Sequence, residues 1–311
     1  MNAVSYQPHD EWPLAQHSSI VRCAGLHWHV QNLGNGPTVV LIHGTGASTH
    51  SWRDVAVNLS QDYTVLMFDL PGHGFTSSGS REQMCLSGMS RAVGALIHQV
   101  SARVSFIVGH SAGAALACQM VLDNRLQAER IASINGALKP FDGMAGQLFA
   151  PIAKALAVNP LIPRFVSWRA TANDQLVKHL LSDTGSTLDS EGVGYYCTLL
   201  QRKHHVAGAL GMMAQWDLKP LWQKLPRLHI PTLFLAGSQD RTVLPRQSGE
   251  ACSRVQYGTL KCLNGLGHLS HEESPVLCSR ELKHYFTQEA AGAQTAGPQA
   301  PPAIPTANGV I

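Results

Sequence analysis

Continuous apolar runs alternate with amphipathic stretches over most of this chain. The runs at 38–44 (TVVLIHG), 63–69 (YTVLMFD), 104–108 (VSFIV) and 131–136 (IASING) are typical of strands buried on both faces of a sheet. Residues 89–100 place apolar side chains three and four positions apart, which indicates an amphipathic helix. Before these runs the chain has only a short mixed segment and the turn GNGP. The alternation predicts an α/β fold with right-handed crossovers and a mostly parallel, doubly wound sheet.

The alternation is interrupted between about residues 137 and 225. This block has the apolar spacing of helices and no strand-like run, and a structureless loop of that length is improbable in a compact domain. Strand-like runs return at 232–237 (TLFLAG) and near 260–265 (LKCLNG). We therefore predict a core made of residues 1–136 and 226–289, with a helical cap, 137–225, inserted into it.

The end of the chain has two recognisable parts. Ser274-Pro275 marks the start of the last helix, because proline suits the first helical position. Residues 290–311 are a low-complexity stretch rich in Ala, Gly and Pro, which we expect to be a disordered tail.

Composition narrows the class of protein. With 44% hydrophobic and 14% charged residues, the chain is expected to be compact and globular. A net charge of +3 without a cluster of Lys and Arg argues against nucleic-acid binding. No apolar stretch approaches the roughly 18 residues that span a bilayer, and the first residues do not resemble a secretory signal. The seven scattered cysteines form no CxxC pair, so we expect reduced thiols, no metal site and a cytoplasmic location.

The most informative motif lies in residues 105–117, SFIVGHSAGAALA. An apolar run ends in Gly109-His110-Ser111-Ala112-Gly113 and passes directly into small helix-forming residues. This is the pattern of a nucleophile elbow, in which a strained strand-to-helix turn exposes a serine hydroxyl beside a base. Ser111 is therefore the candidate nucleophile, although a GxSxG serine can also be a simple helix N-cap.

A serine nucleophile needs a base and an acid, which follow in the chain order Ser, acid, His in this architecture. Asp240 comes after the run TLFLAG, and His268 comes after the next strand. Each residue alone has an ordinary interpretation, an Asx-turn for Asp240 and one of sixteen histidines for His268. Their order and their places at predicted strand ends favour the triad Ser111, His268 and Asp240. Asp142 remains an alternative acid and His271 an alternative base.

Donors for an oxyanion are expected on both sides of the serine. The loop Gly44-Thr45-Gly46 can direct the N–H of Thr45 at the oxyanion, and the elbow supplies the N–H of Ala112. The mechanism requires no cofactor. We expect the substrate pocket to be lined by His43, Gly44, His110, Phe141, Phe149, Met212, Met213 and Trp216.

The cap has an apolar composition that suits a large flat ligand. Its aromatic and Met side chains can either cover the site or hold the cap helices together; they are Phe141, Met144, Phe149, Trp168, Tyr195, Tyr196, Met212, Met213 and Trp216. The stretch from Met144 to Val158 is apolar with a single Lys154, so it supports at most a peripheral contact with a membrane surface.

At the motifs HGTG, GHSAG, SQDRTVLP and LGHLSHEE, residues 20–287 resemble the α/β-hydrolase fold superfamily. The cap segments INGALKPFDGMAGQLFAPIAKALAVNPLIPRFVSWRA, DTGSTLDSEGVGYY and HVAGALGMMAQWDL resemble those of the hydrolases known as magnesium chelatase accessory proteins of bacteriochlorophyll biosynthesis. The resemblance implies a cytoplasmic protein of a phototrophic bacterium, linked to magnesium insertion, and assigns the triad to Ser111, Asp240 and His268. It implies magnesium chelatase as a partner.

Three functions fit this reading. The first is hydrolysis of a carboxylic ester of an apolar, tetrapyrrole-related substrate. The second is a non-catalytic accessory that binds a porphyrin or the chelatase. The third keeps the triad for lipid or aryl ester hydrolysis, C–C bond cleavage or perhydrolysis, which the triad alone does not distinguish. A dehalogenase of this fold would need a carboxylate in place of Ser111.

Overall fold

The structure, a computed structural model, describes residues 8, 10–101, 103–140, 159, 161–172 and 174–288. The predictions for Phe141, Asp142, Phe149, the stretch 144–158 and the tail 290–311 lie outside the described residues.

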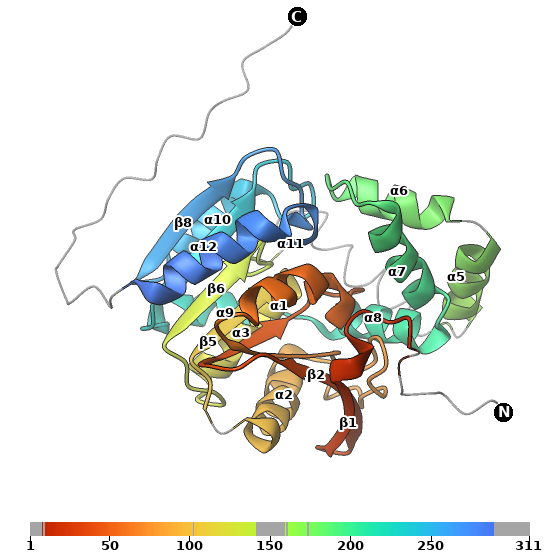
Figure 1. Cartoon of the computed structure of the whole chain (residues 1–311), viewed down its shortest axis with the longest axis horizontal. Helices are drawn as coiled ribbons and strands as arrows, with labels where there is room; N and C mark the ends of the chain where they lie inside the picture. The colour runs from red at the N-terminus through yellow and green to blue at the C-terminus, as the bar shows by residue number, and fades with distance from the viewer. Residues whose placement is uncertain are drawn as a thin grey trace, which may run out of the picture.

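Eight strands form one sheet in the order β1-β2-β4-β3-β5-β6-β7-β8. Along the sheet, every pairing from β4 to β8 is parallel. The pairings of β1 with β2 and of β2 with β4 are antiparallel. The mostly parallel sheet of an α/β-hydrolase fold is thereby confirmed (Figure 1). The strands are β1 Ser18–Cys23, β2 Leu26–Leu33, β3 Thr38–Ile42, β4 Thr64–Phe68, β5 Phe106–His110, β6 Arg130–Ile134, β7 Thr232–Gly237 and β8 Gly258–Leu263.

The hairpin of β1 and β2 was not predicted from the sequence. Ala24 and Gly25 join the two strands with positive φ angles of 50° and 78°, as in a tight hairpin turn. β1 is nowhere fully buried, because it forms the edge of the sheet. Exposed or half-buried polar residues such as Arg22 and His27 interrupt the apolar pattern that revealed the central strands, and so does the buried Gln31, whose amide donates to the Pro13 and Leu14 oxygens.

Helices cover both faces of the sheet, and each face has its own core. Val39 and Leu41 of β3 pack with helices α1 and α12, whereas Val40 and Ile42 point to the opposite face, covered by α2, α3, α9 and α10. This alternation follows from the two-residue period of a strand. The helices of the two layers are α1 Arg53–Leu59, α2 Leu86–Val100, α3 Ala112–Leu122, α9 Lys219–Lys224, α10 Pro245–Cys252, α11 Ser270–Glu273 and α12 Pro275–Thr287, with short 3₁₀ turns at Ala15–His17, Thr49–Trp52 and Leu225–Arg227.

Two helix predictions are confirmed. The stretch 89–100 lies within α2, and α12 begins at Pro275. Ser274 precedes α12, but its side chain makes no capping hydrogen bond. The proline at the first position is therefore the feature that marked this helix start.

The chain between β6 and β7 contains α5 Leu161–Ala172, α6 Gln175–Asp183, α7 Ser190–Leu200, α8 Lys203–Gln215 and α9. In Figure 1 helices α5 to α8 gather beyond one end of the sheet, and α5 lies outermost. We use cap for the described residues 161–224; the exact limits of core and cap stay a prediction. No helix in the described part of the chain is long and apolar enough to cross a membrane.

Candidate active site

Ser111 occupies a strained turn between β5 and α3. Its backbone has φ 51° and ψ −117°, a conformation that an L-residue rarely adopts and that the surrounding structure must enforce. The glycines on either side are required by close contacts: a Cβ on Gly109 would lie 2.4 Å from the Gly113 oxygen, and one on Gly113 would lie 2.2 Å from the Ile42 oxygen. Ser111 is half-buried while its neighbours are buried. The predicted elbow geometry is therefore present.

Asp240 and His268 form a buried hydrogen-bonded pair. The Nδ1–H of His268 donates to Asp240 Oδ2 over 2.8 Å, and both side chains are less than a tenth exposed. This bond fixes the tautomer, because Nδ1 must carry the proton and Nε2 is left to accept one. Asp240 lies beyond the carboxyl end of β7 and His268 beyond that of β8, as the sequence predicts.

Every lone-pair direction of the Asp240 carboxylate is used. Oδ1 accepts from the N–H groups of Thr242 and Val243, both over 2.8 Å. Oδ2 accepts from the side-chain amide of Asn135 over 2.7 Å as well as from the imidazole. Asn135 follows β6 with φ 48°, and its side-chain oxygen Oδ1 accepts from the Ser270 hydroxyl over 2.7 Å. Sequence reasoning missed Asn135, although an Asn-Gly pair after a strand often indicates positive φ.

The two expected oxyanion donors flank the elbow. Ala112 is the first residue of α3, and Thr45 lies in the loop after β3; neither N–H has a hydrogen-bond acceptor among the described residues. The loop approaches the serine closely, since a Cβ on Gly44 would lie 3.0 Å from Ser111 Cβ. Within the described chain no hydrogen bond joins the Ser111 hydroxyl to His268, and catalytic contacts of this kind often form only with substrate bound.

Three side chains hold the loop 44–46 in place. His43 donates from Nδ1 to the Gly44 oxygen over 2.7 Å and accepts from the Leu70 N–H at Nε2 over 2.9 Å. His205 of α8 donates from Nε2 to the Gly46 oxygen over 3.2 Å and accepts from the Gly74 N–H over 3.0 Å. The Thr45 hydroxyl donates to the sulfur of Met212, also in α8, over 3.4 Å. The cap thus fixes the loop that carries one oxyanion donor.

Two residues expected to line the pocket lie elsewhere. His43 is fully buried with both ring nitrogens bonded to backbone, so it positions the loop and does not face a substrate. His110 is 2% exposed and donates from Nε2 to the His268 oxygen over 2.9 Å. Burial and the neighbouring imidazoles of His271 and His268 hold the pKa of His110 well below its usual value. Both side chains therefore lie behind the site.

The remaining pocket candidates differ in exposure. Met212 is fully buried, while Met213 and Trp216 are half-buried in and just after α8. The indole N–H of Trp216 has no partner among the described residues. Gly44 is buried next to Ser111.

His271 lies in the wrong place to serve as the base. It is fully buried between Trp52 and His110, with ring centroids 4.5 and 4.4 Å away, and neither of its nitrogens has a hydrogen-bond partner in the described structure. Burial lowers its pKa to about 3. His268, which does have a carboxylate partner, is thus the better candidate.

The cap is also bonded to the loops that carry Asp240 and His268. Between α6 and α7, the Thr184 oxygen accepts from the Arg241 N–H over 3.1 Å, and the Ser186 hydroxyl accepts from the Leu269 N–H over 2.8 Å. A Cβ on Gly267 would lie 2.3 Å from the Gly185 oxygen, so this contact is backbone against backbone. The position of His268 therefore depends on the cap.

A hydrogen-bonded Ser–His–Asp chain occurs in the hairpin region, away from Ser111. His29 contacts Asp69 Oδ2 through Nδ1 over 2.8 Å and Ser18 Oγ through Nε2 over 2.9 Å. Ser18, however, belongs to the regular strand β1, and His29 and Asp69 are fully buried. Ser18 thus lacks the strained turn that exposes Ser111, and the hydrogen bonds join β1, β2 and the end of β4.

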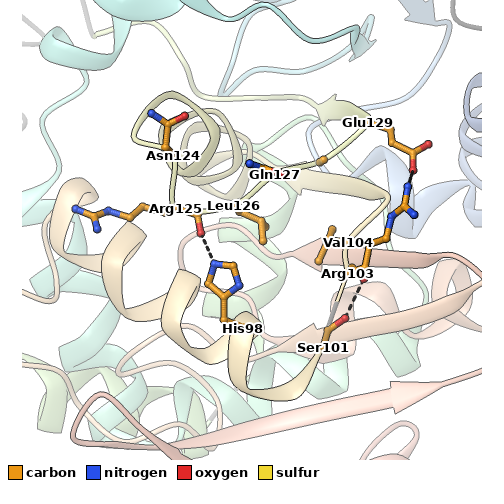
Figure 2. Close-up of a pocket in the computed structure, with 10 residues that line it drawn as sticks. His98, Ser101, Arg103, Val104, Asn124, Arg125, Leu126, Gln127 and Glu129 are labelled. Atoms are coloured by element: carbon orange, nitrogen blue, oxygen red, sulfur yellow. Dashed lines mark hydrogen bonds and ion pairs between the residues drawn. The ribbon is translucent and has the colours of Figure 1, made fainter.

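The pocket in Figure 2, with a volume of about 390 Å³, lies at the opposite end of the sheet from Ser111. It surrounds the amino ends of β5 and β6, and it is lined by His98, Ser101, Arg103, Val104 and residues 124–129. The side chains drawn there form no acid–base constellation, and Arg103 is paired with Glu129 (Figure 2). Among the described residues, no group of three or more His, Cys, Asp or Glu side chains is arranged to hold a metal ion.

The fold and the strand-end site define an α/β hydrolase. The family described as alpha/beta hydrolase fold matches residues 37–275, and the chain belongs to it. Within this family the chain is 39% identical over 263 residues to the magnesium-chelatase 30 kDa subunit of Rhodobacter capsulatus, covering 84% of this chain and 91% of that protein, so it belongs to the same family as that subunit. Both resemblances stated from the sequence are thereby confirmed.

More distant relatives share the fold. The soluble epoxide hydrolase of Corynebacterium sp. (strain C12) is 24% identical over 287 residues, covering 84% of this chain and 93% of that enzyme. The solved structure of the epoxide hydrolase CorEH superimposes with a TM-score of 0.73 at 20% identity, covering 86% of this chain and 98% of that one. An esterase from Exiguobacterium antarcticum gives 0.71 at 15% identity, covering 87% and 99%.

Proposed function

We propose that this chain is a serine hydrolase that cleaves a carboxylic ester of an apolar, tetrapyrrole-related substrate in bacteriochlorophyll biosynthesis, in association with magnesium chelation. The observation that carries the chemistry is the buried 2.8 Å bond between His268 Nδ1 and Asp240 Oδ2, at the same sheet edge as the strained turn of Ser111. The substrate class and the pathway rest on the name of the relative, a magnesium-chelatase subunit.

In the proposed reaction Ser111 attacks the ester carbonyl while its hydroxyl proton passes to His268 Nε2. The N–H groups of Thr45 and Ala112 stabilise the oxyanion of the tetrahedral intermediate. His268 then protonates the leaving alkoxide, which leaves an acyl-serine. A water molecule, deprotonated by the same imidazole, releases the carboxylic acid and restores the serine. Asp240 stabilises the imidazolium at both stages.

A fluorophosphonate probe tests the nucleophile, because it phosphonylates only an activated serine. Wild-type protein should be labelled, and Ser111→Ala should abolish labelling. Ser18→Ala is the matched control, since Ser18 contacts an imidazole that is paired with an aspartate. Labelling that persists in Ser111→Ala, or that disappears in Ser18→Ala, contradicts the assignment. A screen of porphyrin methyl esters against lipid and aryl esters then defines the substrate class.

The name of the same relative favours a second function, a non-catalytic accessory that binds a porphyrin or the chelatase. Complementation of a strain lacking this protein separates the two. Under the hydrolase proposal Ser111→Ala fails to restore pigment synthesis; under the accessory function it restores synthesis as well as wild type does. Association with the chelatase is common to both proposals. A cytoplasmic location is also proposed, supported by the seven free cysteines.

A further inference from the structure

The outer face of helix α5 carries a ridge of exposed apolar side chains. Leu161, Phe165 and Trp168 are 61%, 58% and 62% exposed, and spacings of four and three residues place them on one side of the helix. The rings of Phe165 and Trp168 lie 5.9 Å apart. Figure 1 places α5 at the outer limit of the cap, far from the sheet. Trp168, which the sequence left either to cover the site or to hold the cap helices together, is instead exposed on the outer face of α5.

This ridge is unusual within the molecule. The described structure exposes eight large apolar side chains, and three of them lie on this one helix. These three include the exposed tryptophan and the exposed phenylalanine of the described structure. The opposite side of α5 is buried at Pro163 and Ala170, where the helix packs against α7 and α8. The ridge is therefore exposed on a regular helix whose other side is packed against the rest of the cap.

Positive charge borders the ridge on both sides. Arg164 and Arg169 are exposed and lie on opposite sides of the line through Leu161 and Trp168, as the helical period requires. Neither guanidinium forms an ion pair within the described chain, and α5 contains no acidic residue. The next acid, Asp174, is paired with Lys178 over 2.6 Å.

We propose that the α5 ridge, Leu161, Phe165 and Trp168 with Arg164 and Arg169, docks the protein on an anionic membrane surface. Aromatic side chains prefer the depth of the lipid headgroups, and arginines beside them meet lipid phosphates. A lipid surface suits the ridge better than a protein partner does, because the apolar side chains form a single row on one helix with an arginine on each side. The docked face would hold the cap at the bilayer surface.

Vesicle sedimentation of the full chain tests the proposal. Wild type should bind vesicles of mixed phosphatidylcholine and phosphatidylglycerol more strongly than phosphatidylcholine alone, and salt should weaken binding. The double change Phe165→Ser/Trp168→Ser should reduce partitioning about tenfold or more. Each of Arg164→Gln and Arg169→Gln should reduce it by about fivefold. Val276→Ser and Arg280→Gln are the matched controls, because both residues are exposed on α12, and they should bind as wild type.

Circular dichroism verifies that each variant is folded before binding is measured. Ser111→Ala should bind vesicles as wild type does, so failure of the hydrolase proposal leaves this test intact. Lack of binding by wild type, or unchanged binding by the ridge variants, overturns the proposal. A concentration-dependent dimer that the ridge variants abolish, without lipid binding by wild type, also overturns it and makes the ridge a contact between copies.

Discussion

Asn135 is the residue that connects the acid of the candidate triad to the rest of the core. Its amide donates to Asp240 Oδ2, the same oxygen that accepts from His268, and also to the Gly267 oxygen over 3.3 Å. Because two donors share one oxygen, the amide sets where the carboxylate sits relative to the imidazole. Asn135 is a positioning residue in the proposed mechanism, since it acts through Asp240.

Replacing Asn135 by Ala should slow fluorophosphonate labelling of Ser111 by about 10- to 100-fold, because Asp240 loses a buried donor that orients it. Labelling of the Asn135→Asp variant should be slower still at neutral pH, since a second carboxylate 2.7 Å from that of Asp240 raises the pKa of the pair. Asn32→Ala, at an exposed position of β2, is the control. Labelling of Asn135→Ala at the wild-type rate would show that the carboxylate is positioned without it.

Local sequence patterns predicted the elbow and the histidine–aspartate pair, because each lies in a motif at a strand end. His205 and Ser186 had no such signal, and the Asn-Gly pair at residue 135 indicated a turn but not the bond to Asp240. Their roles depend on partners more than 80 positions away along the chain, which only the folded arrangement brings into contact. His43 and His110 were misplaced in the pocket because a residue next to a motif can as easily face the core.

At the scale of elements, α8 touches the loops that follow β3 and β4. A Cβ on Gly208 of α8 would lie only 2.1 Å from the Gly72 oxygen, so helix and loop meet backbone to backbone. Three residues further along the same helix, a Cβ on Gly211 would meet nothing closer than the Met84 methyl, at 3.6 Å. Two glycines of one helix thus differ sharply in the space beside them.

Gly208→Ala should lower the free energy of unfolding by about 1–3 kcal/mol, because the helix must move away from the loop. Gly211→Ala should leave it unchanged or raise it by up to about 1 kcal/mol, because alanine favours the helix. Urea unfolding of the two variants beside wild type measures the difference. Equal stability of the two would mean that α8 does not press on residue 72.

Predicting elements from the sequence succeeded where both sides of a strand are buried. The elbow strand was placed at 104–108 but spans Phe106–His110, because Gly109 and His110 pair with Ser133 and Ile134 of β6 although they are not large apolar residues. The hairpin of β1 and β2 escaped prediction for a related reason. Backbone pairing and not side-chain pattern defines the ends and edges of this sheet.

Across the whole molecule, histidine is used as a buried neutral group. Burial lowers the pKa of seven histidine side chains, which are His43, His50, His73, His110, His204, His205 and His271. Their pKa values in the folded state lie below the value near 6.5 of the unfolded chain. The unfolded state therefore binds more protons as the pH falls, and the stability these groups contribute is present above pH 6.5 and lost below it.

The free energy of unfolding should accordingly fall as the pH drops from 6.5 to about 4.5, by about 1.4 kcal/mol per pH unit at most for each histidine that stays neutral in the folded state. His271→Phe should remove one such contribution, because His271 has a folded-state pKa of about 3 and, within the described structure, no hydrogen bond to lose. Urea unfolding over this pH range measures both slopes. A slope for His271→Phe equal to that of wild type would contradict the assignment of acid sensitivity to buried imidazoles.

The backbone contacts Gly72–Gly208 and Gly185–Gly267 have a consequence for how such proteins recombine. In each contact one glycine comes from the core and the other from the cap. A chimera whose cap carries a side chain at position 185 should push the cap away from the loop of His268, and one with a side chain at position 208 should push α8 away from the loop after β4. Exchange of the cap between family members should therefore preserve the fold best where the incoming cap keeps both glycines.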